Sequence, residues 1–154
     1  MFHVVLVEPE IPPNTGNIAR LCLATGAHLH LVGPLGFSLD DRQLRRAGLD
    51  YWPQVQKTVW ASWGEFWQPP RSTPPAKRAF FLTTKATRPY HAVGFQRGDF
   101  LIFGRETRGL PEGLLAAQPA EARLTIPMLP EARSLNLATA VAIVLFEAVR
   151  QVTA

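Results

Sequence analysis

The sequence predicts an α/β protein in which a parallel sheet forms the middle layer of a three-layer sandwich. Short apolar runs of strand length alternate with stretches of helical period, which is the pattern of strand–helix units around a parallel sheet. Several apolar runs are uninterrupted, as in strands that are buried on both faces. The length of 154 residues and the hydrophobic content of 47% suit one globular domain, so we expect residues 1–154 to form a single domain.

The first half of the chain is expected to contain three strands and three helices. The first apolar run ends at Glu8, the helical stretch after it stops at Gly26, and a second apolar run ends at Gly33-Pro34. Ser62 and Glu65 have the spacing of a capping box that opens a short aromatic helix. The expected elements are strands at 4–7, 29–32 and 55–59, and helices at 14–25, at 40–47 and just after Ser62.

The second half begins with a proline-rich stretch, residues 68–78, which we interpret as a loop because too little chain lies on either side for two domains. The last helix is apolar on more than one face, which predicts a homodimer, although burial within the monomer is an alternative. In a dimer, Val141 or Leu145 is the expected contact. The expected elements are strands at 79–83, 100–103 and 123–126, and helices at 111–117 and 134–152.

The charge balance and the cysteine content exclude several classes of protein. Sixteen basic and twelve acidic residues give a net charge of +4, which permits a polyanionic partner without requiring one. Cys22 is the single cysteine, which excludes an internal disulfide and a four-cysteine zinc site and suits a reducing compartment. The N-terminus lacks a basic signal-peptide start, and no apolar run reaches the roughly 18 residues of a membrane span. We therefore expect a cytoplasmic protein.

Several common functional motifs are missing from the chain. The phosphate-binding patterns Gly-x-Gly-x-x-Gly and Gly-x-x-x-x-Gly-Lys-Ser/Thr do not occur, and neither does the Gly-x-Ser-x-Gly of α/β-hydrolases. His28 and His30 share one strand face without an obvious third ligand, so we interpret them as structural and expect no metal site. Cys22 is assigned to the core. The aromatic side chains that could stack on bases, but are more simply core or interface residues, are Trp60, Trp63, Phe66 and Trp67.

Two loops contain polar residues that secondary structure alone does not explain. Residues 8–20 follow the first strand and contain Asn14, which can cap the next helix, and Arg20. In the second loop, Gly104 stands at the end of a strand, where ligands bind in open α/β sheets and where a glycine lets the backbone approach closely. That loop also carries Arg105, Glu106 and Arg108, for which a solvated charged turn is the alternative interpretation.

A third loop, residues 126–136, leads from a strand into the last helix. Arg133, Ser134 and Asn136 gather before that helix, where exposed N–H groups favour acceptors and anions, and Ser134 can act as its cap. Because the carboxyl ends of parallel strands lie at one edge of a sheet, the three loops together predict one ligand site.

Three ordered motifs in these loops resemble those of the SpoU branch of SPOUT RNA methyltransferases. They are Asn14-Thr-Gly-Asn-Ile-Ala-Arg20, Phe103-Gly-Arg-Glu-Thr-Arg-Gly-Leu-Pro111 and Ile126-Pro-Met with Arg133-Ser-Leu-Asn-Leu-Ala138. The opening Glu8-Pro-Glu-Ile-Pro-Pro-Asn-Thr-Gly-Asn, with Arg45-Arg-Ala-Gly-Leu-Asp-Tyr51 and Leu82-Thr-Thr-Lys85, is similar to the TrmL (YibK-like) members. The resemblance implies a deep C-terminal trefoil knot and a homodimer, although knots are otherwise rare. It also implies a SPOUT domain without an appended RNA-binding domain.

The resemblance implies a reaction and a set of site residues. The reaction is 2′-O-methylation of the wobble nucleotide, cytidine or uridine 34, of leucine tRNAs by S-adenosylmethionine, which leaves S-adenosylhomocysteine. The cofactor contacts fall on Leu82, Gly104, Ile126, Ser134 and Leu135. The residues expected in the catalytic site are Asn14, Arg20, Glu106, Ser134 and Asn136. Candidate contacts to RNA phosphates in the anticodon loop are Arg42, Arg45, Arg46 and Arg133.

The implied chemistry is a single in-line displacement, which needs no metal and depends largely on placement of the reactants. The family proposal makes Arg20 the base that removes the hydroxyl proton. A guanidinium normally stays protonated, so Arg20 is also a candidate to stabilise the developing alkoxide while a phosphate takes the proton. Rival functions are methylation of another RNA site, a non-catalytic RNA-binding dimer and a nucleotide-dependent dehydrogenase. The intact motif residues argue against the second, and the missing dinucleotide fingerprint argues against the third.

Overall fold

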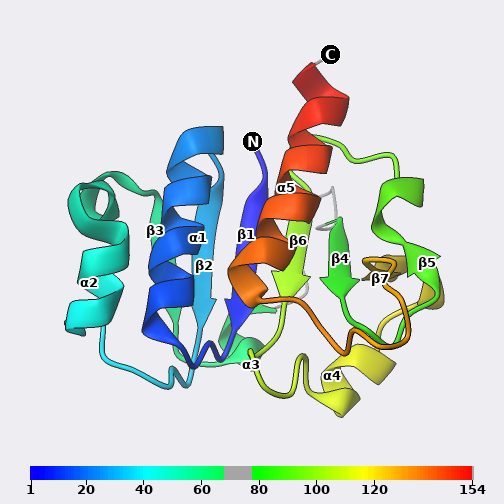
Figure 1. Ribbon diagram of the computed structural model, residues 1–154, viewed down its shortest axis with the longest axis horizontal. Coiled ribbons are helices and arrows are strands. Elements are labelled where there is room, and N and C mark those ends of the chain that lie inside the picture. The colour runs from blue at the N-terminus through cyan, green and yellow to red at the C-terminus, as the bar shows by residue number, and fades with distance from the viewer. Residues whose placement is uncertain (68–77, 154) are drawn as a thin grey trace.

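The computed structural model describes residues 1–67 and 78–153, and its strands form one parallel sheet (Figure 1). The strand order is β3-β2-β1-β6-β4-β7-β5, and every pairing is parallel. This confirms the predicted α/β class with a parallel sheet. The strands are β1 (His3–Val7), β2 (His28–Val32), β3 (Lys57–Trp60), β4 (Ala79–Leu82), β5 (Arg88–Pro89), β6 (Phe100–Phe103) and β7 (Arg123–Thr125). The sequence did not predict β5, because its two residues form no apolar run.

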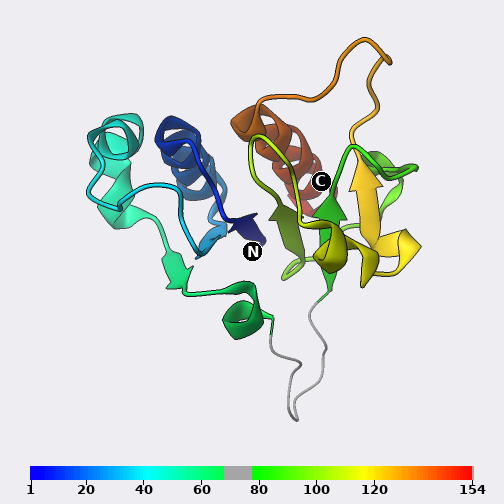
Figure 2. The ribbon, with the colours of Figure 1, turned by 90° about the horizontal axis from the view of Figure 1, so that it is seen from below.

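Helices cover both faces of the sheet, as Figure 2 shows: α1, α2 and α5 lie on one side, and α3 and α4 on the other. Within the described residues, no helix has the length and apolar character needed to cross a membrane. The predicted loop at 68–78 lies outside the described residues except for Arg78. The helices are α1 (Pro12–Thr25), α2 (Arg42–Gly48), α3 (Trp63–Phe66), α4 (Glu112–Ala116) and α5 (Leu137–Thr153), with 3-10 turns at Leu49–Gln54 (η1), Tyr90–Ala92 (η2) and Ala120–Ala122 (η3).

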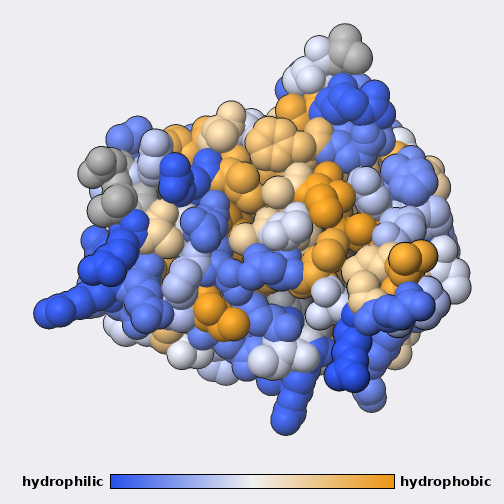
Figure 3. Space-filling model, in the orientation of Figure 1, coloured by the Kyte–Doolittle hydropathy of each residue, from blue (hydrophilic) through white to orange (hydrophobic). Residues whose placement is uncertain are grey.

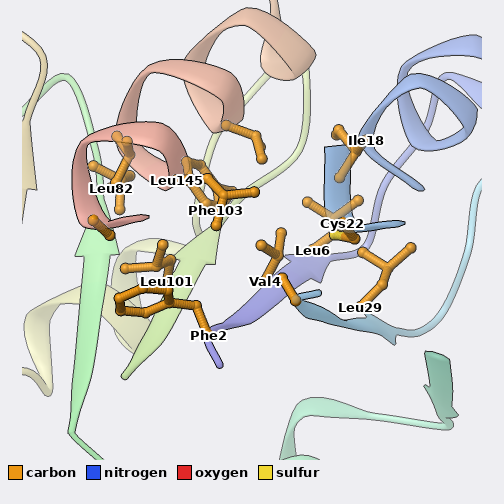
Figure 4. Packing of buried hydrophobic residues seen from close by; sticks show 14 of the residues in the cluster. Phe2, Val4, Leu6, Ile18, Cys22, Leu29, Leu82, Leu101, Phe103 and Leu145 are labelled. Carbon is orange, nitrogen blue, oxygen red and sulfur yellow. The ribbon is translucent and has the colours of Figure 1, made fainter. Parts of the chain in front are cut away.

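The core is divided by the sheet into two apolar clusters, because side chains alternate between the two faces of each strand. Val4 and Leu6 of β1 point toward α1 and α5, where Figure 4 shows them packed with Cys22 and Leu145. Val5 packs in the opposite cluster, with Phe66 of α3 and Leu115 of α4. The prediction that Cys22 is a core residue is therefore confirmed, since it is fully buried.

The N-terminus of α1 differs from the expected one. The helix begins at Pro12, with Ile11 as the N-cap and without a side-chain cap, so Asn14 does not have the capping role that its residue type allows. Pro12 and Pro13 have no N–H group, which leaves fewer donors to be capped at this end. Asn14 lies inside the first turn, where its buried side chain is available for contacts with other loops.

The start of α5 also differs from the prediction. The helix begins at Leu137, and the cap is Asn136, whose Oδ1 accepts from the N–H groups of Ala138 at 2.9 Å and Thr139 at 3.3 Å. The prediction that Ser134 caps this helix is therefore wrong, because an asparagine stands closer to the first turn and satisfies its donors. Ser134 is exposed in the preceding loop.

One apolar side of α5 packs against the sheet, and another is exposed. Val141 and Leu145 are fully buried against the chain's own sheet, so neither is a contact to another copy, contrary to the prediction. Phe146 lies on the outer side of the helix and keeps 46% of its surface exposed. In Figure 3, apolar side chains gather on the face that α1 and α5 present to the viewer.

The residues considered and rejected as ligands pack on the α3 side of the sheet. His30 accepts at Nδ1 from the indole N–H of Trp60 at 3.1 Å, and His28 Nε2 lies 2.8 Å from the hydroxyl of Thr58. Among residues 1–67 and 78–153, no group of three or more His, Cys, Asp or Glu side chains is arranged to hold a metal ion. Phe66 is buried among aromatic rings, which confirms its assignment to the core.

Candidate active site

The carboxyl ends of the parallel strands, at the bottom of Figure 1, carry the loops that surround a cavity of about 310 Å³. This volume is in the range of small-molecule sites, which are commonly about 300–1,000 Å³. The cavity lies between the segments after β4, β6 and β7, as the order of a parallel sheet leads one to expect. Its lining brings together the five residues assigned to the cofactor, which are Leu82, Gly104, Ile126, Ser134 and Leu135.

The rim of the cavity is rich in cationic side chains. Lys85, Arg105, Arg108 and Arg133 line it, and Glu106 is the acidic residue among them. Arg105 makes an ion pair with Glu8 at 3.6 Å through one terminal nitrogen, while its Nε–H is buried and has no hydrogen-bond partner among the described residues. The cavity therefore offers positive charge to an anionic ligand group.

Glu106 connects the loop after β6 to the start of α1. Its carboxylate accepts from the backbone N–H of Glu10 at 2.9 Å and of Ile11 at 2.7 Å, and from Nδ2 of Asn14 at 3.4 Å. These donors lie at the N-terminus of α1, where the helix dipole favours a negative group. Glu106 thus does for α1 what a local capping side chain does in other helices.

Asn14 joins all three motif loops. It donates to Glu106 in the second loop, and its Oδ1 accepts from Nδ2 of Asn136 in the third loop at 3.1 Å. Asn14 is buried, and these two contacts fix the orientation of its amide. The structure therefore brings Asn14, Glu106 and Asn136 together beside the cavity.

Arg20 is not brought to the cavity of its own chain. It lies on an exposed side of α1, where its guanidinium carbon is 5.0 Å from the centre of the Tyr51 ring. The three arginines of α2 are exposed and also do not line the cavity, and Arg45 pairs with Asp40 at 3.4 Å. Among the candidate RNA contacts, Arg133 lines the cavity, whereas Arg42, Arg45 and Arg46 do not.

Gly104 is required by the loop that follows β6. A Cβ atom at this position would lie 2.1 Å from the backbone carbon of Gly109 and 2.1 Å from the backbone nitrogen of Leu110. The loop folds back on itself through two backbone hydrogen bonds between Arg105 and Gly109, and Gly109 has a positive φ of 67°. We expected Gly104 to allow approach of a ligand, and the structure adds that it allows approach of the chain itself.

Sequence reasoning left several residues at this edge without a role. The cavity is also lined by Thr107 and Met128, and Glu10 contacts Thr107 from outside it. Their position directly after strands was the available signal, because every such loop lies at the same edge of the sheet. The segment after β4 follows the same rule, with Thr83, Thr84 and Lys85 in the lining.

A protein-family model matches almost the whole chain. Residues 1–146 match the model described as the SpoU rRNA Methylase family. The chain belongs to the SpoU methylase family. Two SpoU relatives named tRNA (cytidine(34)-2′-O)-methyltransferase resemble it closely. The one from Burkholderia cenocepacia is 54% identical over 98% of this chain and 96% of its own, and the one from Escherichia coli K12 is 51% identical over 98% and 94%.

Solved structures from work on RNA methylation have the same fold. A structure from work on the 2-OH methylation of C/U34 on tRNA has a TM-score of 0.91 and 46% identity, over 99% of this chain and 97% of that one. An AdoMet-bound rRNA methyltransferase from Sinorhizobium meliloti has a TM-score of 0.84 and 29% identity, over 99% of this chain and 57% of that one. The second shows that an rRNA methyltransferase of this fold binds S-adenosylmethionine.

Proposed function

We propose that this SpoU-family protein methylates the 2′-hydroxyl of nucleotide 34, cytidine or uridine, in tRNA, with S-adenosylmethionine as the methyl donor. The observation that carries the proposal is the Asn14–Glu106–Asn136 network beside a cavity at the strand ends, in a chain about half identical to enzymes named for this reaction. We further propose leucine tRNAs as the substrates and the cytoplasm as the location, where tRNA is modified. The 154 residues would act as one catalytic unit without a separate RNA-binding unit among them.

The residues around the cavity fit S-adenosylmethionine. Apolar side chains of Leu82, Ile126 and Leu135 suit an adenine ring, and the cationic side chains of the rim suit the carboxylate of the methionine part. The bound cofactor would supply a methyl group on a sulfonium, which is an electrophile. We propose that Gly104 and Ser134 complete the contacts to the cofactor.

A trefoil knot is the proposed path of the C-terminal chain. After β7, residues 127–133 run beside Thr84 and Ala86 in the segment that follows β4. The chain then returns to the middle of the sheet, where α5 packs against α1 and β6. This return across β4 is the path that a knot of the implied kind requires.

A homodimer is the proposed assembly, with the outer side of α5 and the adjoining side of α1 as the interface. The support is the exposed apolar surface described above, where Phe146 remains 46% exposed on an otherwise well-packed helix (Figure 3). Association of this face with a second copy would bury that surface.

We propose that Arg20 acts at the cavity of the partner protomer. It does not line its own cavity, yet α1 contacts α5 and therefore belongs to the proposed interface. A guanidinium in that position would stabilise the alkoxide that forms on the ribose, or hold a phosphate that accepts the proton. Asn14, Glu106 and Asn136 would orient the loops around the ribose, with Ser134 at the mouth. Arg42, Arg45, Arg46 and Arg133 would contact RNA phosphates.

The test is single-turnover methyl transfer to leucine tRNA at saturating S-adenosylmethionine, with nucleosides identified by mass spectrometry. We expect 2′-O-methylation at position 34, loss of most of the rate in Arg20→Ala and nearly unchanged cofactor affinity in that variant. An Arg20→Lys variant that keeps a measurable rate would indicate that the positive charge stabilises the alkoxide. A lysine variant as slow as Arg20→Ala would indicate that Arg20 acts as the base or that its planar guanidinium is required. The absence of any methylated nucleotide 34 with the wild-type protein would refute the proposed function.

A mixing experiment tests the position of Arg20. Ser134→Tyr should block the cavity of the protomer that carries it, and the fold should tolerate the change because Ser134 is exposed. Arg20→Ala should leave the cavity of its own protomer intact. Two inactive variants, mixed and re-associated at random, would form about one half mixed dimers with one working site each, or about a quarter of wild-type activity. No recovery on mixing would show that Arg20 acts within its own chain.

A further inference from the structure

Two glutamates cross over between the loop after β1 and the loop after β6. The carboxylate of Glu106 accepts from the backbone N–H groups of Glu10 and Ile11, as described above. In the opposite direction, Oε1 of Glu10 accepts from the hydroxyl of Thr107 at 2.7 Å and from its backbone N–H at 3.2 Å. We call these four reciprocal contacts the glutamate clasp. It joins residues that are more than 90 positions apart in the sequence.

In the clasp, the negative charge of each of the two carboxylates is stabilised by hydrogen-bond donors. Each carboxylate faces N–H or O–H donors of the opposite loop, and hydrogen bonds to an ionised acceptor are stronger than neutral ones. The hydrogen bonds from Thr107 hold the pKa of Glu10 below its ordinary value, and the charges of Arg105 and Arg108 act in the same direction. Glu10 is therefore ionised at neutral pH, as the clasp requires.

The loop held by the clasp is strained. Glu8, two residues before Glu10, has a φ of 54°, which lies in the left-handed region that favours glycine. Such a conformation persists only where the surrounding structure holds it. Glu8 is held by its N–H, which donates to the carbonyl of Val32 at 2.7 Å, and by its ion pair with Arg105. The clasp holds the same loop from its other end.

The two ends of the clasp contact different parts of the site. Thr107 and Glu106 line the cavity, whereas Glu10 does not. Glu106 also contacts Asn14, which contacts Asn136, so a continuous series of hydrogen bonds runs from the cavity rim through the clasp to the start of α5. A loss of Glu10 would release Thr107 at the cavity and loosen the loop that carries Asn14.

We propose that Glu10 is a positioning residue of the methyltransferase site, which through Thr107 fixes the rim of the cofactor cavity and through its own loop fixes Asn14. This inference rests on the proposed function, because it assigns the cavity to S-adenosylmethionine. Glu10 itself contacts neither the cavity nor any of the residues to which we assign chemistry, except through its backbone N–H on Glu106.

The test is calorimetry of S-adenosylmethionine binding, combined with single-turnover methyl transfer, for substitutions on both sides of the clasp. Glu10→Ala removes the acceptor and should weaken cofactor affinity roughly tenfold, as expected for a charge-assisted hydrogen bond. It should also slow transfer at saturating cofactor, since Asn14 is less well held. Glu10→Gln keeps an acceptor oxygen for Thr107 and should retain most of both. Glu121→Ala changes an exposed glutamate of η3, remote from the cavity, and should change neither.

The Thr107 side of the clasp supplies a second set of variants in case Glu10→Ala does not fold. Thr107→Val removes only the hydroxyl and should weaken the cofactor, whereas Thr107→Ser keeps the hydroxyl and should bind as the wild type does. In the double variant Glu10→Ala with Thr107→Val, the loss should equal that of Glu10→Ala alone, because Thr107→Val removes a hydrogen bond that Glu10→Ala has already broken.

The outcomes separate this proposal from a structural role and from the proposed function. A lower binding stoichiometry with unchanged affinity would mean that Glu10 only keeps molecules folded, and would overturn the proposal. Native affinity and rate in both Glu10→Ala and Thr107→Val would overturn it as well. Failure of the wild-type protein to bind S-adenosylmethionine would instead reject the function on which the proposal rests.

Discussion

Gly104 shows how one residue can serve the backbone and the site at once. Its position at the end of β6 puts it in the cavity lining, and the returning chain at Gly109 and Leu110 leaves no space for a side chain. The contact is with backbone atoms, which cannot rotate away as a flexible side chain can. The smallest substitution at this residue therefore displaces the whole loop that carries Glu106.

Gly104→Ala is accordingly predicted to abolish detectable cofactor binding and to lower the free energy of unfolding by about 1–3 kcal/mol, the usual effect of overpacking. Calorimetry and thermal unfolding measure the two quantities. Gly113→Ala is the matched control, because a Cβ at that position in α4 meets no atom within 4 Å. It should bind normally and be no less stable than the wild type. Equal behaviour of the two variants would contradict the assigned role of Gly104.

The ionisation of Glu10 leads to a pH prediction. Its pKa is lowered in the folded protein by hydrogen bonds from Thr107, so its contribution to stability is fully present above its ordinary pKa of 4.5 and is lost as the pH falls through the lowered value. Glutamine does not titrate. The stability advantage of the wild type over Glu10→Gln should therefore be constant above pH 5 and shrink below about 4.5. Denaturant unfolding at several pH values measures it; a constant difference down to pH 3 would argue against an ionised clasp.

At the scale of the elements, periodicity predicted most strands and helices, but not their ends. Apolar runs revealed β1, β2, β4 and β6 because parallel strands are buried on both faces. Ser134 and Asn14 were expected to be caps because their residue types favour caps, yet Asn136 and the backbone of Ile11 occupy those positions. Local propensity leaves several nearby polar residues equivalent, and the choice among them depends on contacts from loops distant in sequence.

The two roles of Asn136 can be separated by substitution. Asn136→Ala should lower stability by about 1 kcal/mol, because α5 loses its cap. Asn136→Asp keeps the capping oxygen but loses the N–H donated to Asn14, so it should retain stability and lose methylation rate. Ser134→Ala should leave stability unchanged. Chemical unfolding and single-turnover assays check this, and a destabilised Ser134→Ala would contradict the assignment of the cap.

For the whole molecule, sequence reasoning grouped the site correctly only in part. Its topological rule that carboxyl ends of parallel strands meet at one edge brought the three loops together, and the structure agrees. The rule contains no information on which side of a helix faces a cavity, so it did not separate Asn14, which points to the other loops, from Arg20, which points to Tyr51. The contacts between Glu10 and Thr107 were also not predicted, because side-chain contacts between loops distant in sequence produce no periodic pattern.

The proposed dimer is testable at Phe146. Phe146→Glu should leave the protomer folded, because this side chain is half exposed, and should weaken association by roughly 3–5 kcal/mol if it becomes buried against a second copy. Val59→Glu is the matched control, since Val59 is 47% exposed on the edge strand β3. Analytical ultracentrifugation should show monomers for the first variant and wild-type dimers for the second. Dimers that persist in Phe146→Glu would move the interface elsewhere.

The position of β1 has a consequence for the order of events during synthesis. This strand lies between β2, which follows it closely, and β6, which leaves the ribosome about a hundred residues later. An emerging chain can therefore pair only one side of β1, and long-range pairing of this kind forms slowly. Residues 8–14 reach their final contacts only after Glu106, and later Asn136, have been synthesised. A nascent chain therefore lacks a complete active site until synthesis has reached the start of α5, the last helix. Incomplete chains thus cannot modify RNA.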